Sequence, residues 1–179
     1  MRKFILWVLG IIVVAVAGLF AYASTLPDSF RIERSASYTA APQTVFAVLS
    51  DFNKSAEWSP WEKLDPQMER KISGAPSGVG AIYEWKGNKD VGSGRQEIIE
   101  ATSPSLVRVK LDFNEPMQTT NTVDYVIEPE GTGTKLTWAM YGPQPLIARV
   151  FSIFMDIDGM VGGDFEKGLA NLKPVVEGQ

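Results

Sequence analysis

The sequence contains no cysteine and no histidine among its 179 residues. Without cysteine the chain can form no disulfide bond, carry no lipid on a cysteine and use no thiol nucleophile. Without histidine it lacks the side chain that most often serves as a general base or a metal ligand near neutral pH. No phosphate-binding glycine loop and no zinc-ligand spacing occurs either. We therefore expect no metal site, no cofactor and no catalytic residues.

Positive charge is scarce after the first three residues. The remainder of the chain carries 15 basic and 21 acidic residues, a net charge of −6. A surface with this balance repels phosphate backbones, so we expect no nucleic-acid partner. About 155 residues follow the N-terminal segment, which suits one domain that buries roughly two-thirds of its unfolded surface.

A long apolar run is the most informative feature that is present. Phe4 to Ala23 forms 20 residues without a charged side chain, and Arg2 and Lys3 precede it. A helix of this length spans about 30 Å, the thickness of the hydrocarbon core of a bilayer. By the positive-inside rule the N-terminus lies in the cytoplasm. We expect a single-pass membrane anchor over residues 1–25 and a domain over 26–179 outside the cytoplasm, periplasmic if the protein is bacterial.

A cleaved export signal is the alternative to this anchor. Ala21-Tyr22-Ala23 has the small-x-small pattern of a cleavage site, which predicts export after cleavage at Ala23. The apolar run is longer than the usual 7 to 15 residues of a signal, and Trp7 and Tyr22 lie near its ends as interfacial aromatic residues do. We favour the uncleaved anchor.

The domain begins with a strand and two short helices. Apolar and polar residues alternate over Ser29 to Thr39, which is typical of a half-buried strand, although Arg34 interrupts the apolar face. A helix is predicted from Pro42 to about Asp51, and a second, short one ends near Trp58. After a loop over 59–66, six strand-like runs separated by turn residues predict an antiparallel meander. These runs are 68–73, 81–86, 95–101, 106–113, 120–128 and 135–141.

The C-terminal segment has the period of a helix. Its apolar residues recur in steps of three and four from Leu146 to Leu172, and Pro174 follows the predicted end. A sheet with one apolar face needs a cover, and this helix is the element long enough to supply it. Gly159, Gly162 and Gly163 interrupt the pattern, which indicates a kink or a close approach of the helix backbone to the sheet or to a ligand.

The order of these elements resembles the helix-grip fold of the START-like superfamily. Trp58-Ser-Pro-Trp61, Asp65-Pro66 and Asp164-Phe-Glu-Lys-Gly-Leu-Ala-Asn-Leu-Lys173 are similar to the polyketide cyclase/dehydrase and lipid-transport group, over nearly all of the chain after the anchor. The resemblance implies an α+β domain in which a curved sheet of about six to seven strands wraps around a long C-terminal helix. It also implies an apolar cavity between sheet and helix that holds a lipid-like or aromatic molecule.

Large side chains on the expected apolar faces are the candidates for lining that cavity. We expect ligand contacts from a set of mostly aromatic residues, although simple core packing explains each of them as well. In the 58–61 loop the two tryptophans either rim the mouth of the cavity or plug the edge of the sheet. The candidates are Trp61, Tyr83, Trp85, Phe113, Trp138, Met140 and Phe154, together with Asp158 as a polar group.

Asp158 is the carboxylate of most interest. It lies in the apolar middle of the predicted helix, where burial raises the pKa of a carboxyl group, whereas a modest rotation of the helix leaves it in water. The other groups able to transfer protons form no recognisable pair, and Glu84 and Asp112 fall on the polar faces of their strands. The sequence therefore favours a membrane-anchored protein that binds a hydrophobic small molecule or lipid. A cyclase- or dehydratase-like enzyme, with Tyr83, Tyr125 or Tyr141 as players, and a structural module that binds another envelope protein remain alternatives.

Overall fold

The computed structural model describes residues 1–115 and 117–178, and the chain forms two compact units. The first unit contains residues 1–30 together with 143–157. The second contains 31–142 together with the chain from Asp158 onward. The N-terminal helix and the cavity described below belong to different units.

Helix α1 (Arg2–Thr25) dominates the first unit. Its stretch Lys3–Thr25 is long and apolar enough to cross a membrane, with a mean hydropathy of 2.8 and no residue of the most apolar window buried in the protein. A signal sequence near the N-terminus can pass the same test of length and composition. A short helix, α4 (Leu146–Ser152), packs against α1 in the same unit.

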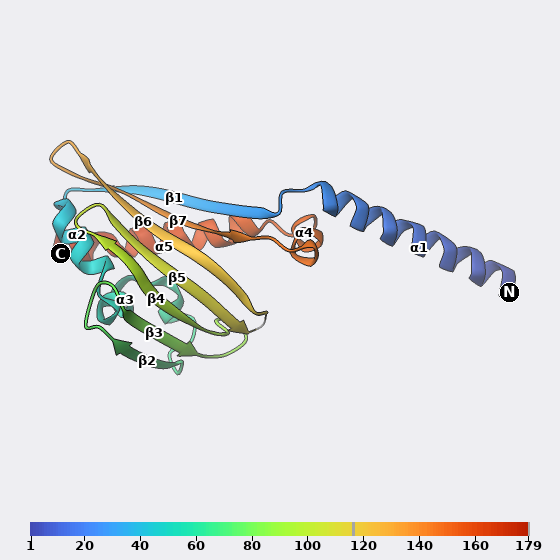
Figure 1. The fold of residues 1–179 in the computed structure, drawn as a ribbon, viewed down its shortest axis with the longest axis horizontal. Coiled ribbons are helices and arrows are strands. Elements are labelled where there is room, and N and C mark those ends of the chain that lie inside the picture. Colours follow the sequence, from blue (N-terminus) through green and yellow to red (C-terminus); the bar gives the residue numbers. More distant parts are fainter. Residues whose placement is uncertain (116, 179) are drawn as a thin grey trace. The chain divides into compact units, whose positions relative to one another are not determined.

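The described residues of the second unit are built around an antiparallel sheet of seven strands, in the order β1-β7-β6-β5-β4-β3-β2 (Figure 1). Strands β2 to β7 form the predicted meander, in which each strand pairs with the next, and β1 closes the order beside β7. Gly78, Gly80, Gly92 and Gly131 have positive φ and lie in the turns between strands. The strands are β1 (Ser29–Tyr38), β2 (Glu69–Gly74), β3 (Ala81–Lys86), β4 (Ser93–Thr102), β5 (Leu106–Glu115), β6 (Thr119–Glu130) and β7 (Gly133–Pro143).

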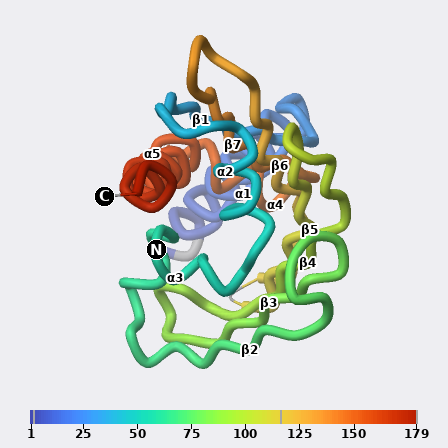
Figure 2. The backbone as a smooth tube through the Cα atoms, turned by 90° about the vertical axis from the view of Figure 1, so that its left-hand side faces the viewer, coloured from blue at the N-terminus to red at the C-terminus, as the bar shows by residue number. Residues whose placement is uncertain are grey.

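Short helices connect β1 to β2, and one long helix fills the curve of the sheet. The connecting helices are α2 (Pro42–Leu49), η1 (Phe52–Lys54), α3 (Ser55–Trp58) and η2 (Pro60–Lys63). Figure 2 looks almost along α5 (Ile157–Glu177) and shows the sheet curving around it from β1 to β2. Val107, Val109 and Leu111 are buried on the inner face, as are Phe165, Leu169 and Leu172 of α5. This is the α+β helix-grip fold that the sequence predicted.

The prediction of one continuous helix over 146–172 was right at its start at Leu146, and wrong in the middle and at its C-terminal end. Turns at 153–156 separate α4 from α5, and Phe154 and Met155 in these turns are exposed. At the other end α5 runs through Pro174 to Glu177, where Val176 is buried and the Glu177 carboxylate accepts a hydrogen bond from the backbone N–H of Thr39 at 2.8 Å. Tertiary contacts thus retain a last turn that the proline alone disfavours.

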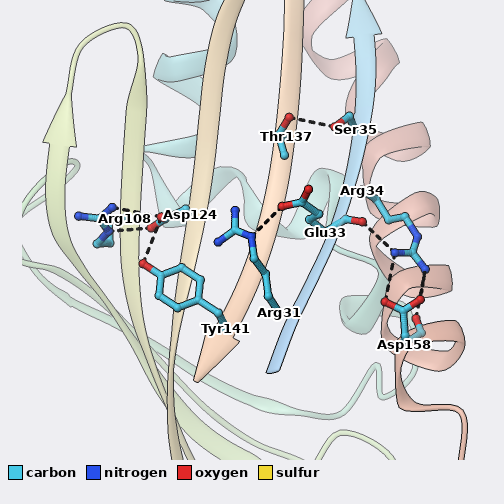
Figure 3. A network of polar contacts seen from close by, with 9 residues as sticks. All are labelled: Arg31, Glu33, Arg34, Ser35, Arg108, Asp124, Thr137, Tyr141 and Asp158. Carbon is cyan, nitrogen blue, oxygen red and sulfur yellow. Dashed lines mark hydrogen bonds and ion pairs between the residues drawn. The ribbon is translucent and has the colours of Figure 1, made fainter. Parts of the chain in front are cut away.

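Arg34, which interrupts the apolar pattern of β1, ties that strand to α5. Its guanidinium donates to Asp158 at 2.8 Å (Figure 3). It also donates to Glu166 at 3.0 Å. The arginine lies directly over Gly162, where a Cβ atom would clash with the guanidinium. Gly162 therefore allows the close approach to the sheet that was one of the two expectations. Helix α5 remains continuous through its glycines, so the kink is not observed.

Two glycines of α5 provide a matched test of this packing. A Cβ atom on Gly168 would lie 2.6 Å from the Trp138 ring, whereas one on Gly163 would meet nothing within 4 Å. We expect Gly168→Ala to lower the free energy of unfolding by up to about 2 kcal/mol, because overpacking costs about 1–3 kcal/mol and the gain in helix propensity is about 1 kcal/mol. Gly163→Ala is expected to raise it by about 0.5–1 kcal/mol. Urea unfolding of the full chain in detergent, followed by circular dichroism, measures both, and equal effects would contradict this packing.

Candidate functional site

A cavity of about 220 Å³ lies in the second unit between the inner face of the sheet and α5. The strands contribute side chains at alternate positions, as Leu111 and Phe113 of β5 and Val123 and Tyr125 of β6 show. The α3–η2 segment forms another wall with Trp58, Trp61 and Glu62. Each strand points every second residue inward, so the curve of the sheet collects side chains from distant parts of the chain around one space.

Six of the eight residues selected from the sequence line this cavity. They come from η2, β3, β5 and β7, and most belong to a network of ring contacts with centroids 4.3 to 6.3 Å apart. The six are Trp61, Tyr83, Trp85, Phe113, Trp138 and Met140.

Trp138 is the centre of the aromatic network. Its ring stacks on Phe165 of α5, with centroids 4.3 Å apart and planes at 10°, and Trp58 and Trp61 meet it edge-on. The 58–61 tryptophans therefore pack against the core while they also line the cavity. Among the described residues the indole N–H groups of Trp58 and Trp138 have no hydrogen-bond partner. Such burial costs about 1–3 kcal/mol per group, which the apolar burial of the rings offsets.

The segments that carry the family resemblance contact one another at this wall. Asn171 donates its side-chain amide to the carbonyl of Trp58 at 3.2 Å, and the Gly168 backbone lies against Trp138 and Pro60. Asp65 accepts backbone N–H bonds from Gln67 and, at 2.8 Å, from Asn88. These residues hold the α3–η2 segment over the cavity.

Trp85 forms the opposite side of the cavity. Its indole N–H donates to the carbonyl of Val91 at 3.0 Å, and its ring meets Phe113 edge-on. Gly94 pairs with Trp85 across β3 and β4, and a Cβ atom there would clash with the Trp85 ring. The glycine thus leaves room for a large ring lying across the neighbouring strand.

Glu62 provides a carboxylate in this largely apolar wall. It was not among the residues selected from the sequence, because it lies in the segment 59–66 that was predicted as a loop. Its side chain is only 7% exposed. It accepts hydrogen bonds from the Tyr83 hydroxyl and from Nε of Arg70, which forms an ion pair with it. A buried carboxylate needs such partners. Those of Glu62 come from β2 and β3, so they are known only when these two strands have been paired. The arrangement places a hydrogen-bonded carboxylate in the cavity lining.

Tyr83 is held in its neutral form. Burial and the hydrogen bond to Glu62 raise the pKa of its phenol. The hydroxyl therefore acts as a donor near neutral pH, and it is not a base. Burial also raises the pKa of Tyr125, whose ring packs against Trp58 and Trp138.

Phe154 and Asp158 are not among the residues that line the cavity. Phe154 belongs to the first unit and its side chain is 71% exposed. Asp158 lies in the first turn of α5, where the hydrogen bond from Arg34 lowers the pKa of its carboxyl group rather than burial raising it. A carboxylate is also favoured at this end of a helix by the helix dipole. Asp158 is thus an ion-pair partner at the sheet, and not a polar group in the cavity.

The remaining proton-transfer candidates lie outside the cavity lining. Glu84 pairs with Lys71, and Asp112 pairs with Lys110 and accepts from Thr120. Tyr141 donates to Asp124, which Arg108 binds through two nitrogen atoms at 2.7 and 3.1 Å (Figure 3). These contacts link neighbouring strands across the outer face of the sheet.

Comparison with known families and structures agrees with this architecture. A family profile described as polyketide cyclase / dehydrase and lipid transport matches residues 29–177. The solution structure of the Aha1 dimer from Colwellia psychrerythraea is similar at a TM-score of 0.59 and 15% identity, covering 83% of this chain and 96% of that one. A Chromobacterium violaceum protein is similar at 0.58 and 16% identity, over 85% and 99%. At this identity the likeness concerns the fold alone. Comparison with curated proteins gave no match.

The buried phenols predict how stability changes at alkaline pH. Burial raises the pKa of Tyr38, Tyr83 and Tyr125. The unfolded chain then releases these protons from about pH 10 while the folded protein retains them, so stability is complete below about pH 10 and falls as the pH rises above it. We expect tyrosinate absorbance from these residues to appear together with unfolding. Tyr125→Phe removes one such group, so its free energy of unfolding should fall less between pH 7 and alkaline pH than that of the wild-type chain. Ionisation of all three tyrosines in the native state would contradict the prediction.

Proposed function

Because this chain belongs to the polyketide cyclase/dehydrase and lipid transport family, we propose that it is a membrane-anchored protein that binds a hydrophobic small molecule or lipid in the cavity of its second unit. The observation that carries the proposal is the aromatic lining of that cavity, to which β3, β5, β7 and η2 all contribute. Such a lining favours flat or chain-like apolar molecules.

The size of the cavity restricts the ligand. Sites for drug-sized molecules occupy about 300–1,000 Å³, and this cavity occupies about 220 Å³. It therefore suits a molecule of one or two rings, or part of one acyl chain, better than a whole phospholipid.

The Glu62 carboxylate in the lining indicates which polar group the ligand carries. Two of the acceptor positions of Glu62 are used by Tyr83 and Arg70, and a carboxylate has about four. A ligand hydroxyl that donates to Glu62 makes a charge-assisted hydrogen bond in a site with little water, so we infer that the preferred ligand has a hydroxyl at one end of an apolar body.

Helix α1 supports the anchoring part of the proposal. Its length and hydropathy suit a membrane span, and the helix continues without a break through Ala23 to Thr25, past the candidate cleavage site. Arg2 and Lys3 at its start favour a cytoplasmic N-terminus and a domain on the other side of the membrane. A tethered cavity meets membrane-soluble ligands at high effective concentration.

An enzyme that uses the same cavity is the second candidate, and Glu62 with Tyr83 is the observation that favours it. The phenol is held protonated and the carboxylate already has two partners, an arrangement that positions a ligand more readily than it removes a proton. Recovery of the ligand in chemically altered form would favour the enzyme.

Native mass spectrometry of the full chain in detergent, followed by organic extraction, tests the binding proposal. We expect a retained apolar molecule with the wild-type chain. Val161 of α5 lines the cavity, so Val161→Trp fills part of the space and should abolish retention. Ile99→Trp is the matched control. Ile99 is 46% exposed and is not among the residues that line the cavity, so this substitution adds a large ring away from the cavity.

Loss of the retained molecule from both variants, or from neither, would contradict binding in this cavity. A wild-type chain that stays free of ligand after incubation with a mixed lipid extract would instead favour a structural module.

Recognition of a ligand hydroxyl by Glu62 is tested with 1-naphthol and naphthalene, which differ by one hydroxyl group. In calorimetric titrations we expect Glu62→Gln to reduce the preference for 1-naphthol about tenfold, because a neutral amide accepts a weaker hydrogen bond by about 1–1.5 kcal/mol. Glu84→Gln makes the same change on the outer face of β3, where Glu84 pairs with Lys71, and should leave the preference unchanged. An unchanged preference in Glu62→Gln would refute recognition of the hydroxyl.

A further inference from the structure

The first unit exposes a group of large apolar side chains around α4. Within residues 143–157 the charged residues are Arg149 and Asp156. Six apolar side chains of this segment are between 37% and 71% exposed. We call them the α4 patch: Leu146, Ile147, Phe151, Phe154, Met155 and Ile157.

Such a density of exposed apolar residues is unusual in water. Single exposed apolar side chains are common on soluble proteins, whereas contiguous groups mark contact surfaces. The patch also includes Phe154, which fits the helical period of the sequence and yet is 71% exposed. The segment therefore has an apolar surface that its own unit does not cover.

The patch is fastened to the C-terminal end of α1. Nη1 of Arg149, in α4, donates to the carbonyls of Ser24 at 3.4 Å and Leu26 at 3.1 Å. Nε of Arg149 donates to the carbonyl of Gln144 at 3.0 Å, and the Gln144 N–H donates to Asp28 at 2.6 Å. The two segments of the unit are thus held together just where α1 ends.

The end of α1 has the features of a helix leaving a bilayer. Ser24 and Thr25 donate their hydroxyls to the carbonyls of Ala21 and Tyr22, so side chains satisfy backbone groups that a bilayer cannot. Tyr22 is 58% exposed in the last turns, where aromatic residues are enriched at the membrane interface. Ala23, in contrast, is fully buried within this unit.

We propose that the α4 patch is a second membrane contact, which inserts into the interfacial layer of the leaflet in which α1 ends. The proposal rests on the membrane anchor of the proposed function. The bilayer is the favoured occupant because the patch is continuous with the end of the span, is rich in Phe, Leu and Ile, and contains few charges that lipid would desolvate. The contact would fix the first unit at one depth rather than leave it on a flexible stalk.

The absence of cysteine from the chain makes a direct depth measurement practical. Single variants Phe154→Cys, Val14→Cys and Glu130→Cys are labelled with an environment-sensitive nitrobenzoxadiazole dye in the full chain. The labelled chains are then reconstituted into phosphatidylcholine nanodiscs whose acyl chains carry bromine. Val14, which is 72% exposed on α1, reports the span, and the exposed Glu130 of the second unit reports water.

We expect bromine to quench the labels at 154 and at 14, and to leave the label at 130 bright. Phe151→Asp, added to the 154-labelled chain, should reduce quenching at least twofold, while the same change leaves the label at 14 quenched.

The two proposals fail in different ways. A quenched label at 14 with a label at 154 that only an aqueous quencher reaches would overturn the membrane contact and keep the anchor. Labels at both 14 and 154 that bromine does not quench would overturn the anchor and the contact together. Quenching at 154 that Phe151→Asp does not reduce would overturn the role of the patch.

Discussion

The stacking of Trp138 on Phe165 is the interaction on which the second unit depends. It joins the last strand of the meander to α5 at a centroid distance of 4.3 Å, and the missing Cβ of Gly168 leaves room for the tryptophan ring. The remaining rings of the α3–η2 segment pack edge-on around it. Because large flat rings in such contacts meet at angles, they close the core on one side while they face the cavity on the other.

Polar contacts set the position of the helix within this apolar frame. Arg34 holds the start of α5 through Asp158 and Glu166, and the Tyr38 hydroxyl donates to the carbonyl of Leu169 further along. The Arg34 pairs are exposed, so their contribution to stability is small, but their direction is specific. On the other wall, Glu62 accepts hydrogen bonds from Tyr83 and Arg70 and supplies a largely buried carboxylate in the cavity lining.

Most strands could be predicted from the sequence, and the site could be predicted in part. Tyr83 with Trp85, and Trp138 with Met140, lie on the inner face because the period of a strand is two. Glycines with positive φ mark turns between the strands. Asp158 and Phe154 were selected by a helical period that cannot tell which side of a helix meets the sheet. Arg34 could have signalled the position of Asp158, since a charged residue on an inner face needs a partner.

Sequence alone determined the fold and an N-terminal helix long and apolar enough to span a membrane: an uncharged run, alternating strands, and an amphipathic C-terminal helix are local patterns set by the geometry of each element. The tertiary structure decided where the pattern breaks between α4 and α5, that Glu62 lies in the cavity wall, and that Arg149 joins α4 to the end of α1. These outcomes depend on contacts between residues far apart in the chain. A period can be recognised within one element of the sequence, whereas the partners in such contacts are defined only when the chain has folded.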